Sequence, residues 1–286
     1  MQVEELGVLE TPIALTNTFS VAAVARAQIE QCIAASPETG RSLPTVNPLV
    51  FECNDGFLND IQRMAVSGEH YLQACAQAGV EVAQGSVGAG RGMSSFELKG
   101  GIGTASRRVP AAGGGEHTIG ALVLANYGRL PQLIMAGDPL GARLAERKGM
   151  RPAAGPEPEK GSIILLVATD APLDARQLRR LALRAAAGLA RTGSVFGHGS
   201  GDIALAFSTA YTVPQQSGGA MPAIAMLHDG LIDPLFQAVA DSIEQAILHA
   251  LFRATAVTGR NGHHRDALAD LLPDWPPGAG RATGTA

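Results

Sequence analysis

The segment that most constrains the fold of this chain is an apolar run at residues 161–170, which reads GSIILLVATD. It follows directly on a stretch rich in proline, glycine and charged residues at 149–160. An apolar run of strand length that is bounded on both sides by turn-forming residues is typical of a fully buried β-strand. We therefore expect a buried strand that begins at a hydroxyl side chain, Ser162.

The composition is that of a globular protein with a substantial core. Apolar residues make up 46% of the 286 residues, charged residues only 17%, and 35 residues are glycine. A chain of this length can bury most of the surface that its unfolded form exposes. The net charge of -4, together with basic clusters no longer than pairs, argues against a nucleic-acid partner.

Cysteine usage and hydropathy bear on the compartment. Cys32, Cys53 and Cys75 lack metal-type spacing and cannot all pair, so we expect free thiols in a reducing environment. No apolar run approaches the roughly 20 residues needed to span a bilayer, and the start lacks a basic region followed by an apolar one. These features predict a soluble, cytoplasmic protein that does not bind membranes.

Hydrophobic periodicity and turn residues predict the order of the elements along the chain. A glycine-rich turn between two apolar runs predicts a hairpin, and a polar, glycine-dense loop is expected at 193–202. The expected elements are a strand at 12–20, a helix at 21–34, a strand at 49–53, a helix at 58–78, a hairpin of 106–110 with 118–128, a linker at about 137–161, a helix at 172–190, a strand at 203–209, a helix at 231–258 and a disordered tail at about 276–286.

The glycine-rich residues 85–104 could cradle a phosphate or line a ligand pocket. Neither the spacing of a Walker motif nor that of a dinucleotide-binding loop is present. Glycines that allow close backbone approach at tight turns or around a ligand are the better interpretation.

The sequence does not indicate a nucleophile activated by histidine, because it has no GxSxG elbow. It also has no HExxH pair for a metal. A serine with a free α-amino group needs no histidine, because the amine, with a pKa of roughly 7.7–8.0, can act as the base. Ser162 would gain that group only if the bond after Gly161 were cut. Its own hydroxyl could attack a strained bond at a loop-to-strand junction, but Gly-Ser is a common dipeptide and spacing alone leaves the question open.

Ten segments carry a further signal. They are PIALTNT at 12–18, DGFLNDI at 55–61, VGAG at 87–90, KGGIGTASR at 99–107, LANYG at 124–128, EKGSII at 159–164, VATDAPL at 167–173, LARTGS at 189–194, GSGDI at 199–203 and TGRNGH at 258–263. In this order they resemble segments of the L-aminopeptidase D-esterase/amidase family, also called β-aminopeptidases. The likeness extends over nearly the whole chain.

This resemblance implies a precursor that cuts itself into an α chain at 1–161 and a β chain at 162–286. The two would form one domain of the α+β class, a four-layer α/β/β/α sandwich of the N-terminal-nucleophile (Ntn) hydrolase type. The implied reaction is hydrolysis of the amide or ester bond after a free N-terminal residue of small peptides, amides or esters, through an acyl-enzyme. No metal or organic cofactor is implied, and a homo-oligomer of processed two-chain units is expected.

The resemblance also implies roles for residues at the cut site and around it. Gly161 and Ser162 flank the cut, and Ser162 matches the nucleophile. Ser200 and Asp202 match the pair that supports its proton transfers. Asn126 matches the asparagine that donates to the oxyanion.

Further matches concern substrate binding. Glu52 matches the carboxylate that binds the substrate ammonium, and Gly88 and Gly90 are expected in the pocket wall. Phe57 stands where tyrosine is expected, so a contact of that hydroxyl would be lost. The chain also begins close to its first family segment, so an N-terminal portion is expected to be missing and a sheet to keep an unpaired edge.

Two other functions remain open. One is acyl transfer to an amine on the related ornithine acetyltransferase-like sandwich, whose members favour threonine at the cut. The other is a truncated, non-catalytic remnant or oligomerisation scaffold.

Overall fold

A computed structural model covers the whole chain and describes all residues except 1, 150–159, 216–217, 219–222 and 273–286. Its central feature is a four-stranded sheet in the order β5-β6-β7-β8. The strands β5, β6 and β7 are antiparallel neighbours, and β8 runs parallel to β7. They comprise Gly101–Pro110, Glu116–Asn126, Lys160–Thr169 and Gly199–Ser208.

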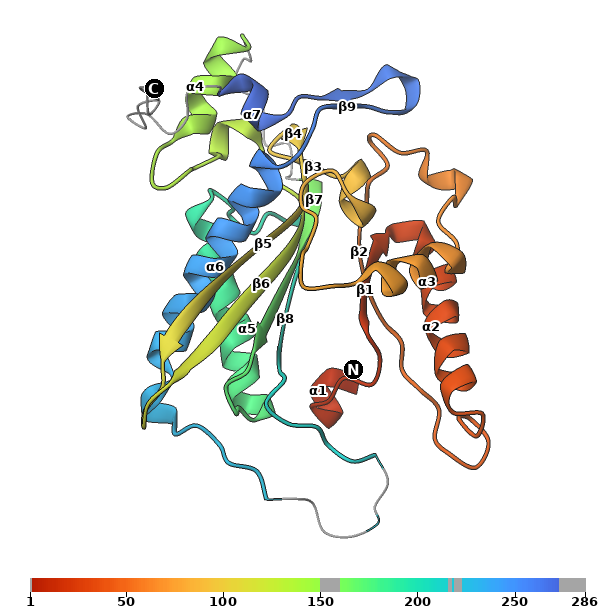
Figure 1. Cartoon of the computed structure of the whole chain (residues 1–286). Helices are drawn as coiled ribbons and strands as arrows, with labels where there is room; N and C mark the ends of the chain where they lie inside the picture. The colour runs from red at the N-terminus through yellow and green to blue at the C-terminus, as the bar shows by residue number, and fades with distance from the viewer. Residues whose placement is uncertain (1, 150–159, 216–217, 219–222, 273–286) are drawn as a thin grey trace, which may run out of the picture.

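The fold has four layers, and its two largest hydrophobic clusters lie between helices α5 (Ala175–Arg191) and α6 (Asp233–Phe252) and the four-stranded sheet, and between the two sheets. Helices α5 and α6 cover one face of the four-stranded sheet. The parallel pair β1 (Ile13–Asn17) and β2 (Leu49–Cys53) lies on the other side, and α2 (Val21–Ala35) and α3 (Gly68–Gln77) form the outer layer (Figure 1). The predicted α/β/β/α order of an α+β sandwich is confirmed.

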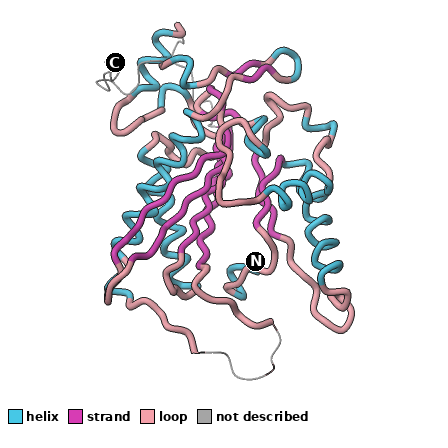
Figure 2. Tube along the Cα trace, in the orientation of Figure 1, coloured by secondary structure: helices cyan, strands magenta, loops and turns pink. Residues whose placement is uncertain are grey.

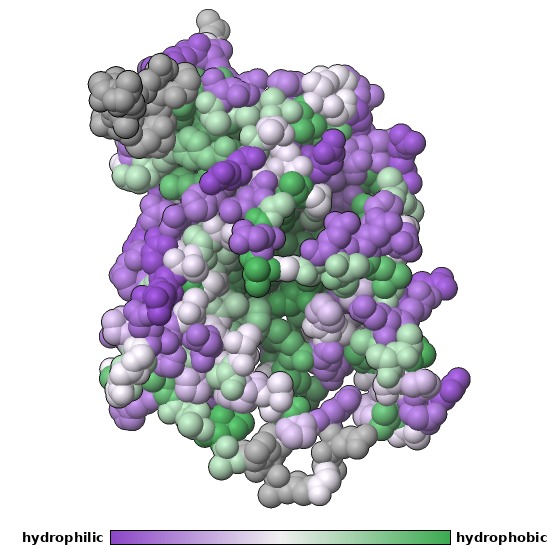
Figure 3. All heavy atoms as spheres, in the orientation of Figure 1, coloured by the Kyte–Doolittle hydropathy of each residue, from purple (hydrophilic) through white to green (hydrophobic). Residues whose placement is uncertain are grey.

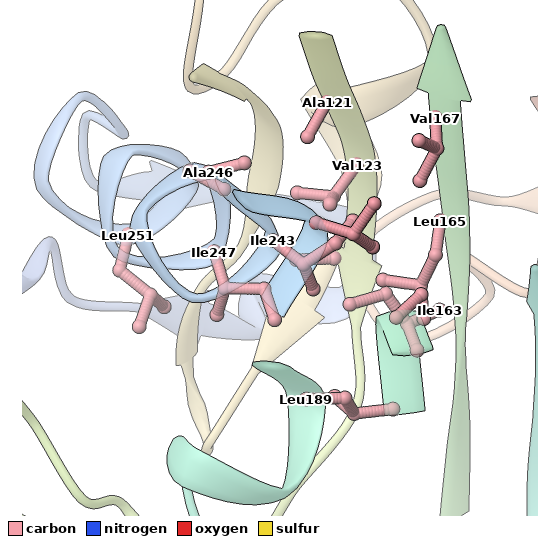
Figure 4. Close-up of a cluster of buried hydrophobic side chains, with 14 of the residues drawn as sticks. Ala121, Val123, Ile163, Leu165, Val167, Leu189, Ile243, Ala246, Ile247 and Leu251 are labelled. Atoms are coloured by element: carbon pink, nitrogen blue, oxygen red, sulfur yellow. The ribbon is translucent and has the colours of Figure 1, made fainter. Parts of the chain in front are cut away.

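The expected buried strand is β7, and its uninterrupted apolar run has a structural reason. Ile163, Leu165 and Val167 pack in the core beside α5 and α6 (Figure 4), whereas Ile164 and Leu166 pack in the core between the two sheets. Successive side chains of a strand point to opposite faces, so a strand covered on both faces must be apolar at every position. Ser162 therefore lies on the same face as Ile164, toward β2.

Smaller elements surround the sandwich, and the tube in Figure 2 shows several of them as short helices and strands outside the main sheet. They are α1 (Gln2–Leu6), α4 (Leu140–Arg147), α7 (Leu268–Leu271), the strand pairs β3 (Ser94–Ser95) with β4 (Leu98–Lys99) and β9 (Val257–Thr258) with β10 (His264–Arg265), and single 3-10 turns at 18–20, 61–63, 88–92, 130–132, 229–231 and 260–262.

Several predicted elements are correct in type and differ in extent. The expected helix at 58–78 is wrong over its first half, since Met64 has a left-handed backbone (φ 45°) and the helix starts only after Ser67 caps it. The expected linker at 137–161 contains α4, and its residues 150–159 lie outside the described part. The expected helix at 231–258 ends at Phe252. The tail at 276–286 also lies outside the described residues.

The second sheet has two strands among the described residues. One edge of β1 pairs with β2, and residues 12–17 line a cavity of about 880 Å³ that also reaches α3 and the glycine-rich loop. Figure 3 shows a hollow lined by hydrophobic residues between the α5/α6 side and the α2/α3 side. Among the described helices, none is long and apolar enough to cross a bilayer.

Candidate active site

Ser162 lies near the start of β7. Its hydroxyl donates to the carbonyl oxygen of Gly161 at 2.7 Å, so the Oγ atom lies against the carbonyl of the bond predicted to be cut. The Ser162 carbonyl oxygen accepts a weak contact from Cys53 Sγ at 3.5 Å. Burial raises the pKa of the Cys53 thiol, so this neighbour stays protonated and is not a competing nucleophile.

Space requires glycine at 161 and leaves little room for a side chain at 201. A Cβ atom on Gly161 would lie 2.4 Å from the carbonyl oxygen of Asn126 and 2.8 Å from Tyr127 Cα, both backbone atoms of β6 or of the turn after it. A Cβ on Gly201 would lie 3.1 Å from Ser162 Oγ. Side chains at these positions would push β7 away from β6 or crowd the hydroxyl.

Asn126 is the register partner of Ser162 on the antiparallel neighbour β6, so the two side chains share one face. Its Oδ1 accepts from the backbone N–H of Ser94 at 2.8 Å, and its Nδ2 donates to the carbonyl oxygen of Asn54 at 3.0 Å. These partners fix which end of the amide is which. The side chain is only 7% exposed, and one of its two N–H groups is left for a further acceptor.

Ser200 and Asp202 were expected in a loop, and they lie in β8 instead. Gly201 is the register partner of Ser162, so strand alternation puts Ser200 and Asp202 on the opposite face. The Ser200 hydroxyl donates to Asp202 Oδ1 at 2.6 Å. In the uncut chain the structure brings this pair to the strand beside Ser162, without a hydrogen bond to it.

Glu52 lies on β2, one residue before Cys53. Because Cys53 faces the four-stranded sheet, Glu52 points toward the α2 side, where its carboxylate accepts a hydrogen bond from the Thr18 hydroxyl. Glu52 therefore neighbours Cys53, which contacts the Ser162 carbonyl oxygen, but the Glu52 carboxylate bonds to Thr18 and not to Ser162.

Of the two glycines expected in a pocket wall, Gly88 lines the cavity of about 880 Å³. It has a left-handed backbone (φ 49°), and a Cβ there would meet no atom within 4 Å. Gly90 does not line that cavity. It is buried against the backbone, where a Cβ would lie 2.7 Å from Gly85 O and Ile102 N.

Phe57, which replaces the expected tyrosine, takes part in a stack. Its ring lies on that of His263 at 4.6 Å between centroids, and the guanidinium carbon of Arg265 lies 3.7 Å from its centroid. The His263 ring nitrogen Nδ1 hydrogen-bonds with the Phe57 carbonyl oxygen at 2.7 Å. Phe57 thus ties the turn after β2 to the β9–β10 hairpin.

Sequence reasoning missed Lys99, whose side chain is fully buried. Its Nζ donates to the carbonyl oxygens of Gly90, Met93 and Gly100 at 2.7, 2.9 and 2.7 Å. Burial lowers the pKa of Lys99 to about 7, while the three carbonyls favour the ammonium, which alone has three N–H donors. The sequence signal that could have indicated this buried lysine is its position as a lone lysine in the glycine-rich residues 85–104.

Replacing Lys99 with methionine is expected to destabilise the fold, because it removes a buried donor from three carbonyls. The Gly90 and Met93 carbonyls keep one backbone N–H each, and the Gly100 carbonyl loses its Lys99 donor. The free energy of unfolding should fall by on the order of 3 kcal/mol, as measured by urea unfolding. Lys148→Met is the matched control: it removes only a partly exposed pair with Asp266 and should cost under about 1 kcal/mol. Equal stability of Lys99→Met and the unchanged protein would show that this bonding does not hold the loop.

The family model described as peptidase family S58 matches residues 1–265. The chain belongs to this family. It is 42% identical over 270 residues to the beta-peptidyl aminopeptidase BapA of Sphingosinicella microcystinivorans, an alignment that covers 91% of this chain and 67% of that relative.

Two solved structures agree with the S58 assignment. A beta-aminopeptidase from Burkholderia sp. has a TM-score of 0.82 and 41% identity over 96% of this chain and 78% of its own. The L-aminopeptidase D-Ala-esterase/amidase from Ochrobactrum anthropi has a TM-score of 0.84 and 33% identity over 95% and 76%. The latter is described as a prototype of the serine aminopeptidases and a variant of the Ntn hydrolase fold. The S58 chain described here is accordingly an Ntn-type serine aminopeptidase, a hydrolase.

Proposed function

We propose that this S58 chain activates itself by cutting between Gly161 and Ser162. Ser162 Oγ attacks the Gly161 carbonyl carbon, the carbon–nitrogen bond breaks as the nitrogen takes the hydroxyl proton, and an ester joins the two residues. Water then hydrolyses the ester, leaving a Gly161 carboxylate and a free Ser162 amine. The observation that carries the proposal is the 2.7 Å contact between Oγ and the Gly161 carbonyl oxygen.

The freed serine then acts on substrate. Its α-amino group takes the hydroxyl proton, Oγ attacks the carbonyl carbon of the substrate's N-terminal residue, and the carbon–nitrogen bond breaks as the leaving amine takes that proton. Water hydrolyses the resulting acyl-enzyme. Asn126 supplies its remaining N–H to the oxyanion; support comes from its register with Ser162, which gives the two side chains the same face of the sheet.

Ser200 and Asp202 are assigned to the proton transfers, because their hydroxyl and carboxylate are already hydrogen-bonded on the strand next to β7. The assignment requires the ends of β7 and β8 to rearrange once the cut frees residues before Ser162. An unchanged kcat in a Ser200→Ala variant would contradict the assignment of this pair to the proton transfers.

Glu52 is assigned to the substrate ammonium, which would displace the Thr18 hydroxyl from its carboxylate. A Glu52→Gln variant with an unchanged KM would contradict that role. The names of the relatives support peptides, amides and esters as substrates. The proposal also holds that the processed two-chain units form a homo-oligomer in the cytoplasm. Size-exclusion chromatography with light scattering tests the oligomer, and cell fractionation tests the compartment.

The pH dependence follows from the base. The rate of hydrolysis, as kcat/KM, is expected to fall as the pH drops below roughly 7.7–8.0, since the Ser162 amine must be unprotonated to accept the proton. The profile should be recorded on fully cut protein, so that processing does not limit the rate. A profile that is flat from about pH 6 to about pH 9 would exclude the amine as base.

A further inference from the structure

Arg265, in β10, is held in place by contacts from two separate segments. Its guanidinium lies over the Phe57 ring at 3.7 Å, and its Nε donates to Ser94 Oγ at 3.3 Å. A planar guanidinium fixed on one face and at one nitrogen keeps its outer N–H groups in a set orientation. The side chain is therefore preorganised to receive a planar acceptor.

This cation has no carboxylate partner within 4.0 Å among the described residues, although other arginines of the chain form such pairs. Glu97 and Asp266 are the nearby acids. The Asp266 carboxylate is taken by Lys148 at 2.5 Å and His264 at 3.2 Å. Burial lowers the pKa of Arg265, with Glu97 and Asp266 acting in the opposite sense. A half-buried guanidinium without a paired anion has donors to spare.

Two hydrogen bonds through Ser94 link Arg265 to Asn126. Ser94 accepts from Arg265 through its hydroxyl and donates through its backbone N–H to Asn126 Oδ1 at 2.8 Å. Asn126 is in turn the register partner of Ser162. One residue, Ser94, thus links the guanidinium to the Asn126 amide through a hydrogen bond at each of its ends. A leaving amino acid that spans roughly 3.5 Å and makes a hydrogen bond of about 3 Å at each end covers roughly 9 Å, which is of the same order as this path.

We propose that Arg265 binds the free carboxylate of the leaving amino acid, so that the preferred substrates are dipeptides with an unblocked C-terminus. The inference rests on the proposed hydrolysis at Ser162 and adds a substrate class to it. Carboxylate oxygens match the paired N–H groups of a guanidinium, and such charge-assisted hydrogen bonds are about twice as strong as neutral ones.

The test compares β-alanyl-L-alanine with its C-terminal amide, which share the same bond to be cut. The unchanged protein should hydrolyse the free acid about 10-fold or more faster, as kcat/KM. Arg265→Gln should lower kcat/KM for the free acid by about 10- to 100-fold, mainly through KM, and change that for the amide by under about 3-fold. Arg265→Lys should restore part of the loss, and the exposed Arg260→Gln should change neither substrate.

Three results would overturn the inference in different ways. Equal rates on acid and amide by the unchanged protein would remove the carboxylate site while leaving the hydrolysis intact. Equal losses on both substrates in Arg265→Gln would show that Arg265 only supports Ser94 and Phe57. Hydrolysis of neither substrate by cut protein would contradict the proposed function and this inference with it.

Discussion

A Ser162→Ala variant is expected to remain a single uncut chain and to lose hydrolysis of small peptides and amides. Without Oγ no ester can form at Gly161, so no free amine is produced, and neither nucleophile nor base exists. Loss of such a unit lowers kcat by on the order of 10⁶. Gel electrophoresis under denaturing conditions reports the cut, and a dipeptide hydrolysis assay reports the rate.

The control for this variant is Ser106→Ala, an exposed serine on β5 of the same sheet. It should be cut and active like the unchanged protein. Circular dichroism should show that both variants are folded, since within the described part of the chain the hydrogen bond of Ser162 Oγ goes to the carbonyl of the neighbouring Gly161 and not to a distant element. Hydrolysis by purified Ser162→Ala at the unchanged rate would overturn the nucleophile assignment.

Replacing Asn126 has the second largest expected effect. Asn126→Ala should lower kcat by about 10²- to 10³-fold, because one oxyanion donor is lost. The fold should be kept at reduced stability, since Ser94 N–H and Asn54 C=O each lose a partner, at about 1–3 kcal/mol per group. Steady-state kinetics on fully cut protein measures the first effect and thermal unfolding the second.

Asn126→Asp separates the two effects. The carboxylate keeps an acceptor for Ser94 N–H, sets its other oxygen against the Asn54 carbonyl oxygen and has no N–H to offer the oxyanion. The rate should therefore fall as in Asn126→Ala although the Ser94 contact is retained. Full kcat in both variants would exclude Asn126 from oxyanion binding.

Several individual strands and helices could be predicted from local signals in the sequence. The apolar run of β7 predicts a strand because both faces of that strand are covered. The glycines at 113–115 predict the turn of the β5–β6 hairpin, and all three have positive φ. The resemblance then supplied the arrangement of the layers, which pattern alone does not give.

Other features depend on contacts that no local pattern encodes. The start of β8 looks like a loop because glycine alternates with polar residues there, and its strand geometry comes only from pairing with β7. The charge on Lys99 gives no hint of burial, because its three carbonyl partners are brought together by the turn at 90–100. Arg265 reaches Ser94 from 171 positions away in sequence.

The central claim is the cut before Ser162, and intact-mass analysis of freshly purified, untagged protein tests it most directly. The proposed chemistry predicts two fragments, one ending at Gly161 and one beginning with a free Ser162 amine, that increase with time at the expense of the full chain. A full-length mass that persists unchanged while the protein hydrolyses dipeptides would contradict the account.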